Sequence, residues 1–191
     1  MTSVTIFGSG NMGSAIAGVL ASGGASVQHI GSSETNAQVT GDIVVLAVPY
    51  PALAAIATNY GEQLAGKVVV DITNPLDFET FDALVVPEGS SAAAQLQQSV
   101  PGAHVLKAFN TNFAATLASG QIGPEKTTVL IAGDDDAAKS ALAAAIEAGG
   151  LAAIDAGSLR RAHELEALGF LQLTLAVGEK IGWNAGFAVV K

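Results

Sequence analysis

Three glycines near the start of the chain have the spacing of a phosphate-binding turn. They form the pattern Gly8-x-Gly10-x-x-Gly13, which follows the β-branched and aromatic run 4–7 and opens a stretch rich in helix formers. In such a strand–turn–helix unit the first glycine allows the tight turn, the second lets the backbone approach a pyrophosphate, and the third lets helix and strand pack closely. The free N–H groups at the helix start then favour an anion. A glycine-rich turn that binds nothing is the alternative, but the position between strand and helix favours a bound dinucleotide.

The end of the second expected strand bears on which dinucleotide is bound. It reads Ile30-Gly31-Ser32-Ser33, and no acidic residue occurs before Glu34. In this fold a carboxylate at that place binds the ribose hydroxyls of NAD, whereas phosphate-binding side chains accommodate NADP. Ser32 and Ser33 can donate to a 2'-phosphate, although no Arg or Lys follows to form the stronger charge-assisted bond. The pattern favours NADP(H) over NAD(H).

Three further segments change abruptly from an apolar run to a turn that carries Pro or an amide side chain. They are Ala47-Val48-Pro49-Tyr50, Asp71-Ile72-Thr73-Asn74-Pro75 and Lys107-Ala108-Phe109-Asn110-Thr111. Pro49, Asn74 and Pro75 can equally be strand terminators, and Asn110 and Thr111 can cap a following helix. Because ligands of open α/β sheets lie across the carboxyl ends of the strands, all three segments are expected to converge on the nicotinamide end.

The elements that position these residues follow a doubly wound α/β pattern. Short apolar runs, several of them continuous Val, Ile and Leu, predict strands buried on both faces of a mostly parallel, Rossmann-like sheet. The expected strands are 4–7, 26–30, 43–48, 68–72, 104–108, 128–132 and 151–155. The expected helices are 11–20, 51–60, 92–99, 112–118 and 136–148.

The connection after the second strand is unusually short. Only about a dozen residues separate the end of the second strand from the start of the third strand at Ile43, which leaves little room for a crossover helix. We expect a short loop or a single turn across 33–41, so that one flank of the adenine side of the cofactor is relatively open.

The composition changes after residue 157 to a long helix-like segment. Leu165, Leu168, Leu171 and Leu175 recur at three- and four-residue intervals and predict an apolar stripe that must be buried. It can pack on the same domain or against its copy in a homodimer. We therefore expect a Rossmann NADP-binding domain over 1–157 and a C-terminal helix with a docked apolar tail over 158–191.

Composition excludes several classes of function. The net charge is -9 with only eight Lys and Arg, which disfavours nucleic acid or an anionic membrane as partner. The chain has no Cys, and its three histidines are too scattered for a metal motif, so no metal is expected. No signal peptide or bilayer-spanning apolar run is visible, and a cytoplasmic location is expected. The acidic run 134–136 lacks the spacing of an EF-hand and is better explained as the N-cap of the helix that follows.

Several motifs together resemble one family. In chain order they are Gly8-Ser9-Gly10-Asn11-Met12-Gly13, Gly31-Ser32-Ser33, Ala47-Val48-Pro49, Lys107-Ala108-Phe109-Asn110-Thr111, Gly133-Asp134-Asp135 and Asp155-Ala156-Gly157-Ser158-Leu159. Their order resembles the coenzyme F420-dependent NADP oxidoreductase family, whose cofactor domain also occurs in the STEAP metalloreductases. The resemblance covers nearly the whole chain.

The resemblance implies an NADP-dependent oxidoreductase that passes hydride between nicotinamide C4 and a flavin-like or deazaflavin (F420-type) ring, a small-molecule redox partner. It implies cofactor contacts in four groups. Gly8, Gly10, Gly13, Ser9, Asn11 and Met12 lie at the pyrophosphate, Ser32 and Ser33 at the 2'-phosphate, and Pro49, Asn74, Pro75 and Asn110 around the ribose and nicotinamide, with Ala47, Val48 and Ala108 in the same motifs. Ser33 stands where family members often carry a basic residue, which departs from the pattern.

No catalytic triad is visible, as expected for hydride transfer, which depends on orientation and distance. His163 with Glu164 and Glu166 could form a proton relay, although a helical His beside carboxylates is more often a surface pair. His104, at the start of a strand, is expected to be structural. The acceptor ring could stack on Tyr50, Phe109, Trp183 or Phe187. Two other functions stay open, namely a pyrroline-5-carboxylate reductase-like imine reductase and a non-catalytic NADPH sensor.

Overall fold

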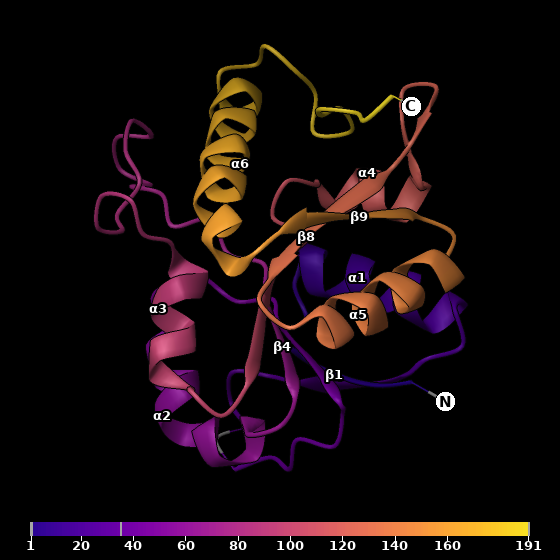
Figure 1. Cartoon of the computed structure of the whole chain (residues 1–191). Coiled ribbons are helices and arrows are strands. Elements are labelled where there is room, and N and C mark those ends of the chain that lie inside the picture. The colour runs from indigo at the N-terminus through magenta and orange to yellow at the C-terminus, as the bar shows by residue number, and fades with distance from the viewer. Residues whose placement is uncertain (1, 35, 191) are drawn as a thin grey trace.

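The computed structural model describes residues 2–34 and 36–190, and its centre is a seven-stranded sheet (Figure 1). The strand order is β2-β1-β3-β4-β5-β8-β9. The bounds are β1 Ser3–Phe7, β2 Ser26–Ile30, β3 Ile43–Leu46, β4 Val68–Asp71, β5 His104–Lys107, β8 Thr128–Gly133 and β9 Ala152–Gly157. All seven expected strands are present, with bounds that differ by at most two residues.

The sheet is mostly parallel, as predicted. Strands β2, β1, β3, β4 and β5 run parallel to their neighbours, whereas β8 is antiparallel to β5 and β9 is parallel to β8. The chain between β5 and β8 forms α4 (Ala114–Ser119) and a small hairpin of β6 (Gln121–Ile122) and β7 (Glu125–Lys126). The sequence analysis missed this hairpin and the reversal that follows it. The chain order reverses between β1 and β3, and this reversal places the switch point of the fold beside the glycine turn.

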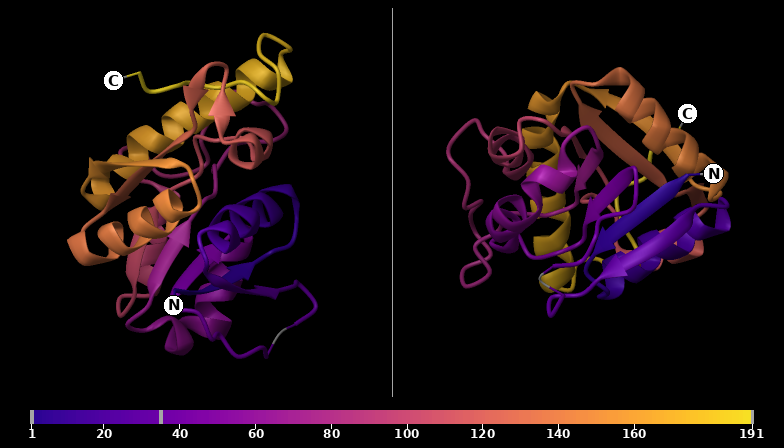
Figure 2. Two further views of the ribbon diagram at one scale, coloured as in Figure 1. Left: turned by 90° about the vertical axis from the view of Figure 1, so that its right-hand side faces the viewer. Right: turned by 90° about the horizontal axis from the view of Figure 1, so that it is seen from below.

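Helices cover both faces of the sheet (Figures 1 and 2). Helices α1 (Asn11–Ser22), α4 and α5 (Asp136–Ala148) cover one face, where Ile16, Leu117 and Leu142 belong to one buried cluster. Helices α2 (Ala52–Leu64) and α3 (Ala92–Ser99) cover the other face with a second cluster. The strands between these layers are apolar on both faces, which explains their continuous Val, Ile and Leu runs.

The short connection from β2 to β3 is confirmed. Its described residues form turns and extended chain without a helix, and β2 is the edge strand of the sheet. Gly41 lets this segment cross β1, because a Cβ there would overlap the backbone of Val4 and Thr5. The Gly41 N–H donates to Thr5 Oγ1 (2.8 Å), and Gln28 Oε1 accepts from Thr5 Oγ1 and Thr40 Oγ1 (2.7 Å each). Hydrogen bonds to Gln28, on the edge strand, thus hold the connection in place in the absence of a helix.

The C-terminal helix does not bury the face that the leucine pattern predicted. After a 3-10 turn, η1 (Leu159–Arg161), helix α6 (Ala162–Val177) buries Ala162, Leu165, Glu166, Gly169, Gln172 and Ala176. Leu165 is buried, but Leu168 and Leu175 are only partly covered and Leu171 is 50% exposed. The prediction was wrong for the stripe as a whole, because polar contacts of Glu166 and Gln172 fix the rotation of the helix. A homodimer through the exposed leucines stays a prediction.

The tail after α6 is attached mainly through its backbone. The Phe187 N–H donates to Gln172 Oε1 (3.1 Å), and the Trp183 ring lies against Phe113 with centroids 5.0 Å apart. Its apolar side chains are largely open to solvent, with Trp183 54% and Val190 73% exposed. The tail contacts the rest of the chain through these groups, but it does not bury its apolar side chains.

Candidate active site

The glycine turn between β1 and α1 has the geometry that its sequence predicts. Gly8 has φ +99°, and its N–H donates to the Ile30 carbonyl (3.0 Å). A Cβ at Gly8 would overlap the Ala47 carbonyl oxygen, and one at Gly13 would lie 2.5 Å from the Gly8 carbonyl oxygen. Two of the glycines are therefore required by backbone packing alone.

Gly10 differs from the other two, because a Cβ there would meet nothing within 4 Å. Gly10 is the N-cap of α1, no side chain of the described residues caps that helix, and Ser9 and Asn11 are exposed. The first-turn N–H groups of α1 thus face open space at the positive end of a 12-residue helix. This open cradle fits a pyrophosphate.

The turn after β2 contains Ser32 and Ser33 with both side chains exposed. The turn is closed by the Glu34 N–H, which donates to the Gly31 carbonyl (3.1 Å). In the reverse direction the Gly31 N–H donates to Glu34 Oε2 (2.7 Å). The Glu34 carboxylate, which lies beyond the strand in sequence, is thereby folded back to the end of β2.

A cavity of about 790 Å³ opens at the carboxyl edge of the sheet, next to the glycine turn. It lies between the start of α1, helix α4, helix α6 and the C-terminal tail. Its lining comprises Asn11, Met12, Ser14, Ala15, Ile72, Asn74, Asn110, Asn112, Phe113, Ala114, Ala115, Ala118, Leu173 and Trp183. The volume and the mixture of apolar walls with a few amides are typical of a site for a small organic ligand.

Two amides from neighbouring strand ends form a pair at the wall of this cavity. Asn110 Nδ2 donates to Asn74 Oδ1 (2.9 Å) and to the Leu165 carbonyl (2.8 Å), and Asn74 Nδ2 donates to the Asn110 carbonyl (2.9 Å). Gly169 lets α6 lie against this pair, because a Cβ there would overlap Asn74 Oδ1 and come within 2.9 Å of Asn110 Nδ2. Helix α6, which forms the roof of the cavity, thus fixes the orientation of both amides.

The backbone just before the two asparagines that follow β5 is constrained. Phe109 is fully buried and has φ +63°, a conformation that costs energy for a residue with a Cβ. The Oδ1 atoms of Asn110 and Asn112 are buried and have no partner among the described residues. Backbone strain and unpaired buried acceptors concentrate at functional sites, and here the strained residue directly precedes two asparagines that line the cavity.

A buried charge cluster lies beneath α6. Lys107 Nζ donates to Asp71 Oδ2 (2.8 Å), to Glu166 Oε1 (2.8 Å) and to the Thr73 carbonyl (2.6 Å), which uses the full donor capacity of an ammonium group. Glu166 also accepts the Ala92 N–H (3.0 Å) at the start of α3. All three charged side chains are fully buried. Burial raises the pKa of Glu166 above its ordinary value, although Lys107 opposes this shift.

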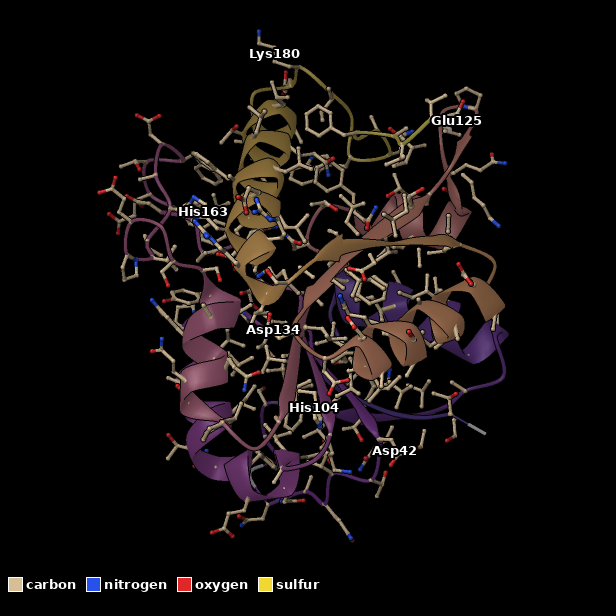
Figure 3. All side chains as sticks on the ribbon, in the orientation of Figure 1. Asp42, His104, Glu125, Asp134, His163 and Lys180 are labelled. Atoms are coloured by element: carbon tan, nitrogen blue, oxygen red, sulfur yellow. The ribbon has the colours of Figure 1, made fainter. Side chains whose placement is uncertain are left out.

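The proton relay around His163, the less favoured of two interpretations, is not formed. His163 Nδ1 donates to the Ser90 carbonyl (2.9 Å), on the side of α6 that faces the loop before α3 (Figure 3). Glu164 instead pairs with Arg161 (2.6 Å), and Glu166 points into the buried cluster. The relay hypothesis was wrong because successive residues of a helix point in different directions.

The two remaining predictions on ionisable groups agree with the structure. His104 pairs with Asp135 (2.9 Å) at the end of the sheet opposite the cavity. This position is consistent with a structural role. Asp135 is the N-cap of α5 and accepts the Ala138 N–H (2.8 Å), so the capping interpretation of the acidic run is confirmed. This hydrogen bond is the main cause that lowers the pKa of Asp135.

The other expected site residues fall into three groups. Asn11, Met12, Asn74 and Asn110 line the cavity, whereas Ala47 and Val48 pack against Gly8 and support the turn. Pro49 precedes α2, Pro75 is buried at the start of the loop 76–90, and Ala108 is fully buried in the core. These last three do not line the cavity.

Of the expected ring partners, only Trp183 lines the cavity. Phe109 lies in the core, and Tyr50 donates to Gln95 Oε1 (2.7 Å) in a smaller cavity between α2 and α3. Phe187 is 45% exposed on the tail.

Sequence reasoning missed several lining residues, notably Ile72, Asn112, Phe113 and Leu173. Asn112 could have been found, since it is the second amide in the turn after β5. Leu173 could not, because only the packing of α6 brings it over the strand ends.

The described part of the chain has neither a cluster of metal ligands nor a membrane-spanning helix. Residues 2–34 and 36–190 contain no group of three or more acidic or histidine side chains that could hold a metal ion. None of the helices that the structure describes has the length and apolarity needed to cross a membrane.

Several comparisons with known proteins identify the same family. Residues 24–75 match the family model described as NADP oxidoreductase coenzyme F420-dependent. The chain is 29% identical over 166 residues to the F420-dependent NADP reductase of Methanocaldococcus jannaschii, covering 85% of this chain and 74% of that protein. It is 31% identical over 166 residues to the F420-dependent NADP reductase of Methanothermobacter marburgensis, covering 83% of this chain and 73% of that protein.

A solved structure from Arthrobacter sp. FB24, described as a candidate F420-dependent NADP reductase, has the same architecture over its whole length. The two chains are 25% identical, the TM-score is 0.85, and the match covers 100% of each chain. The similarity therefore includes α6 and the tail, which form the roof of the cavity.

Proposed function

This chain belongs to the family of F420-dependent NADP reductases, which are NADP-dependent oxidoreductases, and from that premise we propose that it transfers hydride between NADP(H) and a flavin-like or deazaflavin ring, such as F420, in the cavity under α6. One observation carries the proposal. Asn11 and Met12, in the first turn of α1, also line the cavity. A dinucleotide whose pyrophosphate lies on this turn reaches the cavity with its nicotinamide end.

The walls of the cavity fit a flat ring with polar edges. Ile72, Phe113, Leu173 and Trp183 supply apolar surface, and the Asn74–Asn110 pair supplies amide groups whose orientation is fixed. Apolar faces suit the stacked rings, and fixed amides can orient a carboxamide or an imide edge. Residues of this chain would therefore bind and orient both rings.

The lining also fits the type of reaction. Among the described residues that line the cavity, no Asp, Glu, His, Lys or Arg occurs. NADPH, when bound, would supply a hydride at nicotinamide C4, the residues of this cavity would hold the acceptor ring beside it, and the balancing proton would come from solvent. Such a transfer needs alignment and exclusion of water rather than a general acid, and this is what the amide pair and the roof helix provide.

Turnover measurements test the proposal. We expect loss of NADPH absorbance when the purified protein is given F420, FMN or FAD as acceptor. Pyrroline-5-carboxylate serves as the competing imine substrate. Turnover with the imine alone would replace the proposal by an imine reductase, and tight NADPH binding without turnover on any acceptor would identify a sensor.

A cavity-filling variant locates the reaction. Ala118→Trp places an indole on the face of α4 that lines the cavity, and we expect it to reduce turnover at least about tenfold while NADP⁺ still binds. Ala167→Trp adds the same group on the exposed side of α6 and is the matched control. Equal turnover in both variants would contradict the assignment of the acceptor to this cavity.

A further inference from the structure

The Glu34 carboxylate occupies a position that the proposed NADP(H) site does not use. Its Oε2 accepts the Gly31 N–H at 2.7 Å, directly after β2. The backbone of Glu34 is fixed as well, since its carbonyl accepts from the buried Tyr60 Oη (2.6 Å), and the Tyr60 ring packs edge-on against Phe7 with centroids 4.8 Å apart. The carboxylate is thus presented to solvent from a turn anchored in the core.

This position adjoins the glycine turn. Ile30, the last residue of β2, accepts the Gly8 N–H at 3.0 Å, so Gly31 and the Glu34 carboxylate stand next to the start of the dinucleotide site. In this fold a carboxylate at the end of β2 accepts hydrogen bonds from the ribose hydroxyls of the adenosine. Glu34 reaches that place from three residues further along the chain.

No cation balances this carboxylate in the described structure. The lysine nearest in sequence, Lys67, donates to the Gly41 carbonyl (2.7 Å) at the amino ends of the strands, opposite the glycine turn. Lys107 and Lys139 are held by carboxylates elsewhere in the fold. A 2'-phosphate here would meet the Ser32 and Ser33 hydroxyls and a carboxylate, whereas a ribose 2'-hydroxyl could donate to that carboxylate.

We propose that Glu34 sets the cofactor preference of this chain, and that it does so by weakening the binding of the 2'-phosphate, so that NAD(H) binds within tenfold of NADP(H). The inference rests on the proposed dinucleotide site. A phosphate dianion must either displace the Glu34 carboxylate from the Gly31 N–H or bear the repulsion of a like charge, and both reduce its affinity. The ribose of NAD(H) requires neither.

Equilibrium binding tests this without any acceptor. Dissociation constants for NADP⁺, NAD⁺, adenosine 2',5'-bisphosphate and AMP are measured for the wild type and Glu34→Gln. The glutamine keeps an oxygen that can accept the Gly31 N–H but removes the charge. We expect the affinity ratio of NADP⁺ to NAD⁺ to rise about tenfold in Glu34→Gln, with a similar rise for the bisphosphate over AMP.

Glu62→Gln is the matched control, because it removes the same charge from an exposed position on α2. A wild-type preference for NADP⁺ above tenfold overturns the inference, as does a shift in Glu34→Gln no larger than in Glu62→Gln. Failure of both dinucleotides to bind overturns the proposed function together with the inference. Binding without turnover counts against the proposed acceptor alone and leaves the inference standing.

Discussion

The two sides of the cavity are built in different ways. The side proposed to hold the pyrophosphate, called the phosphate side below, consists of backbone groups from the six residues 8–13, placed by one turn and one helix start. The roof side consists of side chains that reach across the fold. Glu166 accepts hydrogen bonds from Ala92 and Ala93, which lie 74 and 73 positions earlier in the sequence. Asn110 contacts Leu165, which lies 55 positions later. The first side is visible as a sequence motif, and the second is not.

This difference teaches where the cavity is vulnerable. Backbone N–H groups of a short turn are retained when the surrounding side chains change, as long as the glycines remain. The roof depends on buried polar atoms, and each loses its partner when one distant residue changes. Substitutions on the roof side should therefore affect stability first, and those on the phosphate side should affect binding first.

The largest effect on stability is expected for Lys107→Met. This substitution leaves the Asp71 and Glu166 carboxylates buried without their ammonium partner, which should lower the free energy of unfolding by about 3–5 kcal/mol. Urea unfolding measures it. The double variant Lys107→Met, Glu166→Gln should recover part of the loss, and a cost below about 1 kcal/mol for the single variant would contradict the role given to the cluster.

A smaller loss is expected for Gly169→Ala, which forces a methyl group against the Asn74–Asn110 pair. We expect about 1–3 kcal/mol of destabilisation, because both amides must move. For the same reason we expect a lower kcat for the oxidation of NADPH by the acceptor. The control is Gly18→Ala in α1, where a Cβ meets nothing within 4 Å and helix propensity predicts a gain of about 0.5–1 kcal/mol. Equal stability of the two variants would show that α6 does not press on the amides.

The roof side should also depend on pH. Burial raises the pKa of Glu166 above 4.5 in the folded protein, so its contribution to stability is complete below 4.5 and is lost as pH rises through the raised pKa. Relative to Glu166→Gln, the wild type should therefore lose stability as pH rises from 4.5. Urea titrations across pH measure this difference. Glu164→Gln, in an exposed ion pair, is the control, and a difference that rises with pH would refute the assignment.

The smallest effect on stability is expected for Gly10→Ala on the phosphate side. The new methyl group enters open space at φ -71°, so the free energy of unfolding should fall by no more than about 1 kcal/mol, the cost of Ala in place of Gly at an N-cap. The same methyl group fills the cradle for the pyrophosphate, and NADP⁺ affinity should fall at least about tenfold. Unchanged affinity, measured by calorimetry, would place the pyrophosphate elsewhere.

Much of the fold could be predicted because its signals are local. Strands β1, β3 and β4 are buried and mostly apolar on both faces, and the short connection at 31–42 left room for only a loop. The reversal of β8 could not be predicted, since strand direction depends on pairing with β5 across the sheet. For the candidate site, Asn74 and Asn110 could be proposed from the strand ends, but their mutual hydrogen bonds could not.

The sequence by itself determined the glycine turn, the order of strands and helices along the chain and the absence of cysteine chemistry, because each depends on the types and spacing of nearby residues. Only the tertiary structure decided which face of α6 is buried, that Glu166 lies in a charge cluster rather than a relay, and that Glu34 returns to the end of β2. The reason is physical. The leucine pattern indicates only that one face of the helix is favoured for burial. Buried carboxylates and amides need hydrogen-bond partners, and these partners fix the rotation of the helix.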